Sequence, residues 1–261
     1  MAHIEPAVYV GLLESGKYSD LIIDCREFAF NVHRTVVCSQ SPMLDAACSG
    51  QFEEASSGRI KFPELHPAII ARAILFMYTG DYDEVSLPKF YMKMSGSEDY
   101  DCYKDFIFDS IKKIDDLGLR HPLKINALLY ACADMLGIPG LKTVASARFM
   151  RDAKIAFGHD WFEVPLRLLY ENTPLADRGL RFQATCLCVE NYDCLDHQTK
   201  TLQVLQEHEP NVWSVAVEVL KQWKSSDQSH SRTKQRQGNE GTPKKQGMGK
   251  GADQTRITGS T

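Results

Sequence analysis

Four residues in the second half of the chain carry the kinds of side chain that bind zinc. Thiolate sulfur and imidazole nitrogen are zinc ligands, and these residues are Cys186, Cys188, Cys194 and His197. In a helix, residues two apart point about 200° away from each other, so Cys186 and Cys188 cannot easily face one ion. The spacing therefore predicts no metal site.

The cysteines as a whole indicate a protein without disulfide bonds. There are eight of them, with no CxxC pair, and most lie within apolar stretches; the other five are Cys25, Cys38, Cys48, Cys102 and Cys132. In a reducing compartment such residues are expected to be small buried apolar side chains.

Motifs of catalysis are absent from the sequence, which contains no GxSxG, HExxH or Walker-type loop. Gly247, Gly249 and Gly251 superficially resemble a phosphate-binding loop, but no predicted strand precedes them and no predicted helix follows. We therefore predict that the chain is not an enzyme, and that it has no cofactor and no small-molecule substrate.

Asp20 and Arg34 are an acid at the start of a predicted strand and a base at the start of a predicted helix. The two side chains can pair; alternatively, the acid caps the helix and the base is a solvated surface residue. His33 directly precedes Arg34, and its imidazole could titrate near neutral pH. We expect His33 to be structural.

The N-terminal half must position these residues on a hairpin and several helices. Residues 4–16 place Ile4, Val8 and Leu12 at helical spacing, which predicts a short amphipathic helix. The β-rich runs Leu21–Cys25 and Phe28–Val32 are separated by two residues, which indicates a β-hairpin.

Helix signals follow the hairpin. Ser41 and Pro42 are an N-cap and a first-turn proline, and they predict a helix that runs to about Gly50. A third strand is expected at Arg59–Phe62, and a strongly apolar helix from Pro67 to Gly80.

Residues 81–122 differ from the segments on either side. They hold many carboxylates, lysines and aromatic residues without a clean period, so we expect an inserted loop with a short helix near 106–117. A helical hairpin then follows, with one helix ending at Gly137 and the next running from Pro139 to about Met150. Further helical patterns lie in residues 161–170, 175–191 and 210–223.

Charge is distributed unevenly along the chain. The net charge is −4, but residues 224–261 hold eight Lys and Arg against three Asp and Glu. The first 223 residues therefore hold 22 basic and 31 acidic residues, a net charge of about −9. An acidic folded part argues against direct nucleic-acid binding, and the polar composition of the tail predicts disorder.

The sequence shows no pattern that predicts a membrane span or a secretory signal. No run approaches the roughly 20 apolar residues of a membrane span, and the opening MAHIEPAVYV lacks the basic and apolar regions of a secretory signal. We expect the chain in the cytoplasm, the nucleus or both, without a membrane partner.

Several motifs, taken in order and spacing, resemble BTB/POZ domains, in particular those of stand-alone BTB proteins of filamentous fungi. The first motifs are Tyr18-Ser19-Asp20-Leu21, Phe28, Asn31-Val32-His33-Arg34, Cys38-Ser39-Gln40-Ser41-Pro42-Met43-Leu44 and Gly50-Gln51-Phe52-Glu53-Glu54. The later ones are Tyr78-Thr79-Gly80-Asp81-Tyr82 and the segment 129–138. The resemblance spans Tyr18 to about Met150 and is interrupted by the insertion.

This resemblance implies an α+β fold, in which a small β-sheet is flanked by a helical cluster, and an interaction module without a catalytic centre. BTB domains commonly form homodimers, and some bind the cullin scaffold of a ubiquitin ligase or transcriptional co-regulators. The sequence offers no zinc-finger, kelch or MATH domain that would serve substrate recognition.

The resemblance also assigns candidate binding residues. Cullin-binding members often show a hydrophobic-x-Glu pattern after the third helix, which Phe52 and Glu54 match; the alternative is that Phe52 packs under the helix end. Asp20 and Arg34 occupy positions of a charged pair near the dimer pocket of the family. The helix with Ile4, Val8 and Leu12 is the expected dimerisation element.

Two functions stay open at this point: an adaptor for a cullin-RING ubiquitin ligase, and a transcription-linked or nuclear scaffold, which the basic tail with Pro243-Lys244-Lys245 favours. The predicted organisation is an N-terminal helix (1–17), a BTB/POZ domain (18–150, insertion 81–122), a helical extension (151–223) and a disordered tail (224–261). We expect the extension to dock on the core, because about seventy residues make a core of marginal stability.

Overall fold

The sheet is built around the hairpin that the sequence predicts. β1 (Leu21–Cys25) and β2 (Phe28–Val32) pair antiparallel, and β3 (Arg59–Lys61) pairs parallel to β1, which gives the strand order β2-β1-β3. The two-residue turn has no glycine, and Arg26 instead takes the left-handed conformation with φ 54°. β2 is thus an edge strand of a three-stranded sheet.

The computed structural model describes residues 6–50, 52–95, 121–191 and 199–210, together with 214, 215 and 218. All of these except Val215 and Glu218 belong to one compact unit, residues 1–214, and only this unit is described below. The predicted tail, the helix expected at 106–117, and Ile4 lie outside the described residues.

Helices surround the sheet in the first half of the chain. They are α1 (Pro6–Ser15), α2 (Arg34–Val37), α3 (Pro42–Ser49), α4 (Glu53–Ser57), α5 (Pro67–Thr79) and α6 (Lys89–Ser95). Ser41 is the predicted N-cap of α3, since its hydroxyl accepts a hydrogen bond from the Leu44 amide at 3.2 Å. Gly80 ends α5 in the left-handed conformation, as expected from its position.

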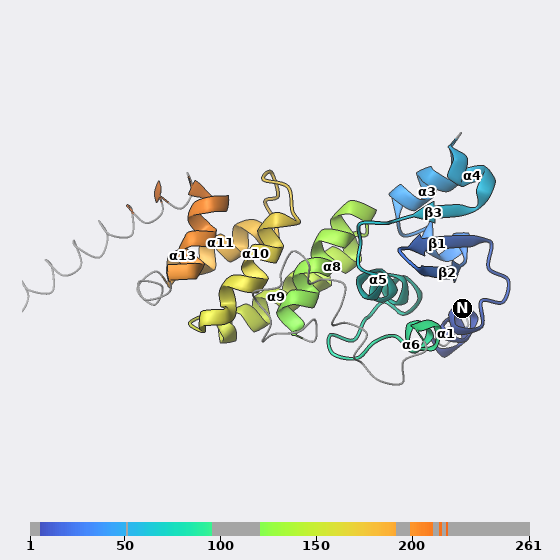
Figure 1. The fold of residues 1–261 in the computed structure, drawn as a ribbon, viewed down its shortest axis with the longest axis horizontal. Coiled ribbons are helices and arrows are strands. Elements are labelled where there is room, and N and C mark those ends of the chain that lie inside the picture. The colour runs from blue at the N-terminus through green and yellow to red at the C-terminus, as the bar shows by residue number, and fades with distance from the viewer. Residues whose placement is uncertain are drawn as a thin grey trace, which may run out of the picture. The chain divides into compact units, whose positions relative to one another are not determined.

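α5 is the central helix of this half, and Figure 1 shows it between the sheet and the later helices. Eleven of its thirteen residues are buried, which explains why its sequence is apolar around the whole circumference. The one buried charge among them, Arg72, donates hydrogen bonds to the carbonyls of Ala68, Asp83 and Ser86. These bonds hold the loop after α5 against the helix.

The segment after α5 contains an element that the sequence did not predict. α6 forms within the stretch expected to be an inserted loop, and Phe90 and Tyr91 are buried. The ring of Tyr91 lies 4.9 Å from that of Phe28 and 6.1 Å from that of Phe30, so α6 packs against β2. At least this part of 81–122 belongs to the packed core.

The second half is helical. Its elements are α8 (Pro122–Leu136), α9 (Pro139–Ala156), the 3₁₀ helix η2 (Asp160–Phe162), α10 (Glu163–Glu171), α11 (Leu180–Glu190) and α13 (Thr199–His208). The hairpin α8–α9 was predicted with its Gly137 turn, and α10 and α11 fall within predicted segments. α13 was not predicted.

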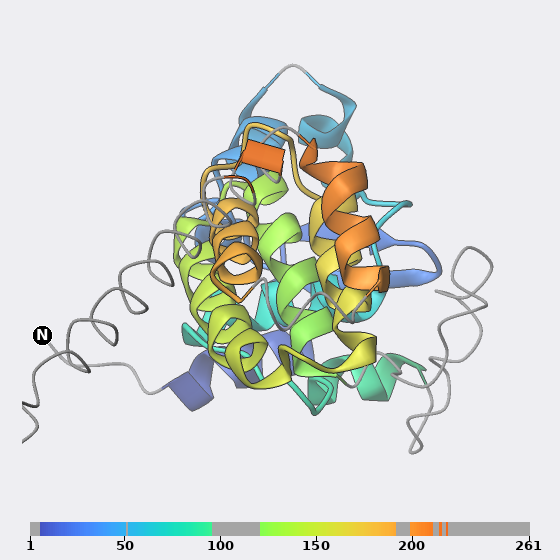
Figure 2. The ribbon, with the colours of Figure 1, turned by 90° about the vertical axis from the view of Figure 1, so that its left-hand side faces the viewer.

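The helical extension packs on the α8–α9 hairpin, as the sequence analysis expected. α10 contacts α8, α11 contacts α9, and α13 contacts α10. Figure 2 views this helical stack from the end that carries α11 and α13. Phe162, Val164, Leu166, Leu169 and Leu187 are buried in it.

The loop between α10 and α11 is fixed to the hairpin by polar contacts. The Tyr130 hydroxyl donates to the Asp177 carboxylate at 2.8 Å and accepts a hydrogen bond from the Leu180 amide at 2.9 Å. Lys142 on α9 lies 3.4 Å from the same carboxylate. Among the described helices, none is long and apolar enough to cross a membrane.

Candidate protein-interaction surfaces

The first candidate binding residue, Phe52, has an exposed aromatic side chain. It precedes α4 and is 65% exposed, although one side of its ring lies over Gly50. A Cβ at Gly50 would stand 2.7 Å from Phe52 Cδ2, so the glycine makes room for the ring. Phe52 is therefore not packed under the end of α3 but presents most of its ring to solvent.

Glu54 lies in the first turn of α4 beside Glu53, and its side chain is partly exposed. Acidic residues at a helix N-terminus are favoured by the helix dipole, which gives Glu54 a structural role as well. The two members of the hydrophobic-x-Glu pattern thus share one end of α4. This arrangement places an exposed apolar ring and a partly exposed carboxylate two residues apart in the chain.

Asp20 and Arg34 lie together, but their side chains do not form the ion pair that was considered. The Asp20 Oδ1 accepts a hydrogen bond from the backbone amide of Arg34 at 2.7 Å, so the carboxylate caps α2. The guanidinium of Arg34 extends toward Gly58, and its Nε is buried without a hydrogen-bond partner in the described part of the chain. The capping alternative describes Asp20 correctly.

His33 is a structural histidine, as expected. Its Nε2 lies 2.8 Å from the Lys17 carbonyl, which only accepts, so Nε2 carries the proton. Its Nδ1 then accepts from the Tyr78 hydroxyl at 2.7 Å, and that oxygen accepts from the His33 amide at 2.9 Å. Burial raises the pKa of Tyr78 to about 12, which keeps the hydroxyl a donor.

α1 presents an apolar outer surface. Val8 is 54% exposed, Leu12 is partly exposed, and Leu13 is the side chain that anchors the helix in the core. Gly11 has no other atom within 4 Å of the position of a Cβ, so its side of the helix is open. Of the predicted stripe, Val8 and Leu12 are available at the surface, while Ile4 lies outside the described residues.

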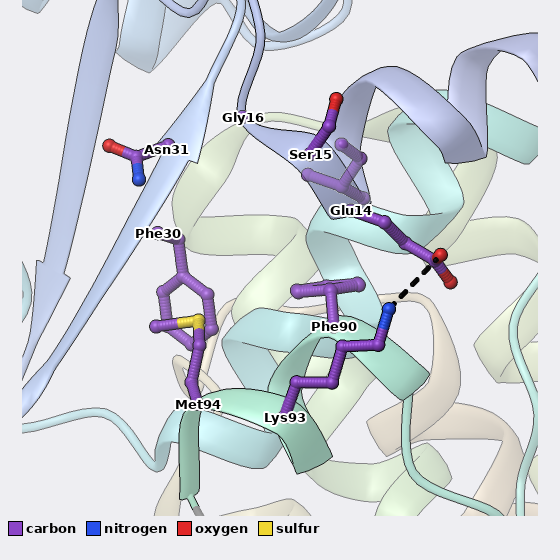
Figure 3. A pocket seen from close by; sticks show the side chains of 9 residues that line it. Glu14, Ser15, Gly16, Phe30, Asn31, Phe90, Lys93 and Met94 are labelled. Atoms are coloured by element: carbon purple, nitrogen blue, oxygen red, sulfur yellow. Dashed lines mark ion pairs between the residues drawn. The ribbon is translucent and has the colours of Figure 1, made fainter.

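A small pocket lies where α1, β2 and α6 meet (Figure 3). Its volume is about 180 Å³, and the side chains of Leu13, Phe30, Phe90 and Met94 give it an apolar lining. The Glu14 carboxylate and the Lys93 ammonium lie 3.6 Å apart at its rim. This pocket was not predicted from the sequence, because α6 was not predicted.

A second pocket, of about 320 Å³, lies between the start of α8 and the end of α9. Trp161 lines it between two imidazoles, with ring centroids 4.5 Å from His121 and 5.4 Å from His159. Ile155 at its rim is 78% exposed. No pattern in the sequence brought these residues together in advance, because they come from three separate elements.

Of the described cysteines, Cys25, Cys132 and Cys188 are buried as expected, whereas Cys38, Cys48 and Cys186 are only partly buried. Burial raises the pKa of Cys25, of Cys132 and of Cys188 to about 12, so these thiols stay protonated and unreactive near neutral pH. Cys186 is only partly buried on α11. Cys194 and His197, the other members of the possible zinc set, lie outside the described residues.

Comparison with known families identifies the N-terminal part. A BTB/POZ domain family model matches residues 9–90, which run from α1 through the sheet and α5 into α6. Residues 9–90 are a BTB/POZ domain. The motifs noted between Tyr18 and Tyr82 fall within the match, whereas the resemblance noted at 129–138 lies beyond it.

The BTB/POZ domain is a protein-interaction module that is typically non-catalytic. Of its candidate binding residues, Leu12, Asp20, Arg34, Phe52 and Glu54 lie within the matched residues, and Val8 lies just before them. The α8–α9 hairpin and the extension packed on it follow the BTB/POZ domain and enlarge its folded unit.

Proposed function

We propose that this BTB/POZ protein is a self-associating adaptor that binds the cullin scaffold of a ubiquitin ligase through Phe52 and Glu54. The observation that carries the proposal is the 65% exposure of Phe52 beside the α4 carboxylates. Aromatic residues are enriched at protein interfaces and among the residues that dominate binding energies.

Self-association is proposed to use the outer side of α1. Val8 and the open side of Gly11 form an apolar helix surface that a second copy can cover, and a two-fold interface would cover both copies at once. Asp20 caps the first residue of α2, Arg34, rather than forming a charged pair with it, so the place of these two residues in this proposal is to hold the start of α2.

Affinity capture of the full chain from cells, followed by mass spectrometry, tests the adaptor proposal. We expect a cullin with the native protein, and loss of at least nine tenths of it with Phe52→Ala/Glu54→Ala. Leu175→Ala is the matched control, since Leu175 is an exposed apolar residue on the distant α10–α11 loop.

The possible outcomes separate the two functions. A cullin that persists with the double variant would show that the function is right and the residues are wrong. Capture of transcriptional co-regulators without any cullin would favour the nuclear scaffold, the alternative that rests on the basic composition of residues 224–261.

A further inference from the structure

β2 offers an open edge for hydrogen bonding. β1 lies between the other two strands, and the Ile22 amide and Asp24 carbonyl bond toward β3. The intervening residue Ile23 therefore faces β2, where it is paired with Phe30. Because bonding directions alternate along a strand, the backbone N–H and C=O of Ala29 and Asn31 point outward from the sheet.

Among the described residues, none forms a strand paired with this edge. Ala29 and Asn31 are exposed, and their backbone groups form no hydrogen bond to any described residue. Natural edge strands are commonly guarded by proline, by charged side chains or by bulges. β2 has the sequence FAFNV, pairs with β1 in continuous register, and has none of these features.

The pocket of Figure 3 lies at the same edge. Phe30 and Asn31 point to opposite sides of β2, yet both line the pocket, which therefore opens at the edge of the strand. Its lining from α1 and α6 combines apolar Leu13, Phe90 and Met94 with polar Glu14, Ser15 and Lys93. There is accordingly open, partly apolar space beside the outward-pointing backbone groups.

We propose that the β2 edge pairs with the β2 edge of a second copy of the chain, so that the two sheets join into one. The strand is self-complementary about Phe30. If Phe30 lies opposite its counterpart on a two-fold axis, Ala29 of each copy lies opposite Asn31 of the other, and each such pair exchanges two hydrogen bonds.

We assign the β2 edge to a second copy of the chain because this edge adjoins the α1 surface. Gly16, at the end of α1, lies against Asn31, with 3.4 Å between the Asn31 Cβ and the position of a Gly16 Cβ. An interface that covers α1 as far as its C-terminal end therefore comes close to the β2 edge. The inference rests on the proposed self-association and names a further element of that same interface.

Sedimentation velocity of the full chain at tens of micromolar tests the inference. We expect a dimer for the native chain and for Ala29→Ser, and at least tenfold weaker dimerisation for Ala29→Pro. Proline removes the outward amide of residue 29 but no bond of the β1–β2 ladder, so it is tolerated on an edge strand. Circular dichroism checks that the variant is folded.

Amide hydrogen exchange of the native chain gives a second test that needs no variant. The amides of Ala29 and Asn31 should become protected as the protein concentration rises, whereas that of Phe30 should be protected throughout. A native dimer in which Ala29 and Asn31 exchange freely, or which Ala29→Pro leaves intact, would overturn the β2 pairing alone. A native chain that is monomeric would instead remove the proposed self-association itself.

Discussion

At the residue scale, His66 shows how a neutral imidazole holds a helix start. Its Nδ1 accepts a hydrogen bond from the Ala68 amide at 3.1 Å and so caps α5, the central helix. Burial, together with the nearby charges of Arg26 and Arg72, lowers the pKa of His66 to about 3. Only the neutral ring can accept this bond, because protonation would place a hydrogen on Nδ1.

This pKa predicts a loss of stability in mild acid. Below pH 6.5, the ordinary histidine pKa, His66 takes up a proton in the unfolded chain, but in the folded chain it stays neutral until about pH 3. The free energy of unfolding therefore decreases as the pH is lowered through this window. The contribution of His66 is constant above about pH 7. We expect it to account for about 1–2 kcal/mol of the stability lost between pH 7 and pH 5.

His66→Asn is the variant that checks this prediction. Asparagine keeps an acceptor for the cap but does not titrate. Urea unfolding at pH 7 and pH 5 should show a smaller pH dependence for the variant than for the native chain. Equal losses in both proteins would show that His66 does not titrate as described.

At the scale of elements, the sequence predicted those whose pattern is local. The hairpin strands match their predicted bounds because both runs are rich in residues that favour strands and only two residues separate them, and the start of α3 follows from Ser41 and Pro42. α6 and α13 were missed, since both are short helices whose place depends on tertiary contacts, those of α6 with β2 and those of α13 with α10.

The candidate site shows the same division. Phe52 and Glu54 were found from a local pattern, but the pocket and the open β2 edge depend on which strand lies at the edge of the sheet and on α6. The charged residues Asp20 and Arg34 were predicted to be neighbours. That the Asp20 carboxylate binds the backbone amide of Arg34, and not its guanidinium, depends on the geometry at the start of α2.

A substitution at Gly179 tests how the extension is attached to the α8–α9 hairpin. A Cβ at Gly179 would lie 2.2 Å from the Tyr130 hydroxyl, so Gly179→Ala must displace the bonds from Tyr130 to Asp177 and Leu180. We expect a loss of about 1–3 kcal/mol in urea unfolding. Gly11→Ala is the control, because its Cβ meets no atom and alanine favours a helix. Equal stability of Gly179→Ala and the native chain would contradict this contact.

At the scale of the whole molecule, the BTB/POZ domain and the helices after it form one folded unit through His208. Buried Arg181 joins the end of this unit, since it bonds to the carbonyls of Tyr170, Thr173 and His208 and pairs with Glu209. The helices of the extension thus contact one another as well as α8 and α9.

Limited proteolysis checks this organisation in the full chain. We expect early cleavage after about Lys224 and protection between Arg151 and Asp160, where α9 leads into η2. Gly179→Ala should make the segment 151–160 more accessible. Early cleavage there in the native protein, with release of an intact N-terminal fragment, would show that the extension is a separate arm.

The proposed adaptor function depends most directly on Phe52, and calorimetric titration of the purified full chain with a purified cullin measures its contribution. We expect Phe52→Ala to weaken binding by about 30-fold or more, which corresponds to about 2 kcal/mol for a residue that anchors an interface. Leu175→Ala should bind like the native chain. Native affinity in Phe52→Ala, or no binding by the native chain, would contradict the account.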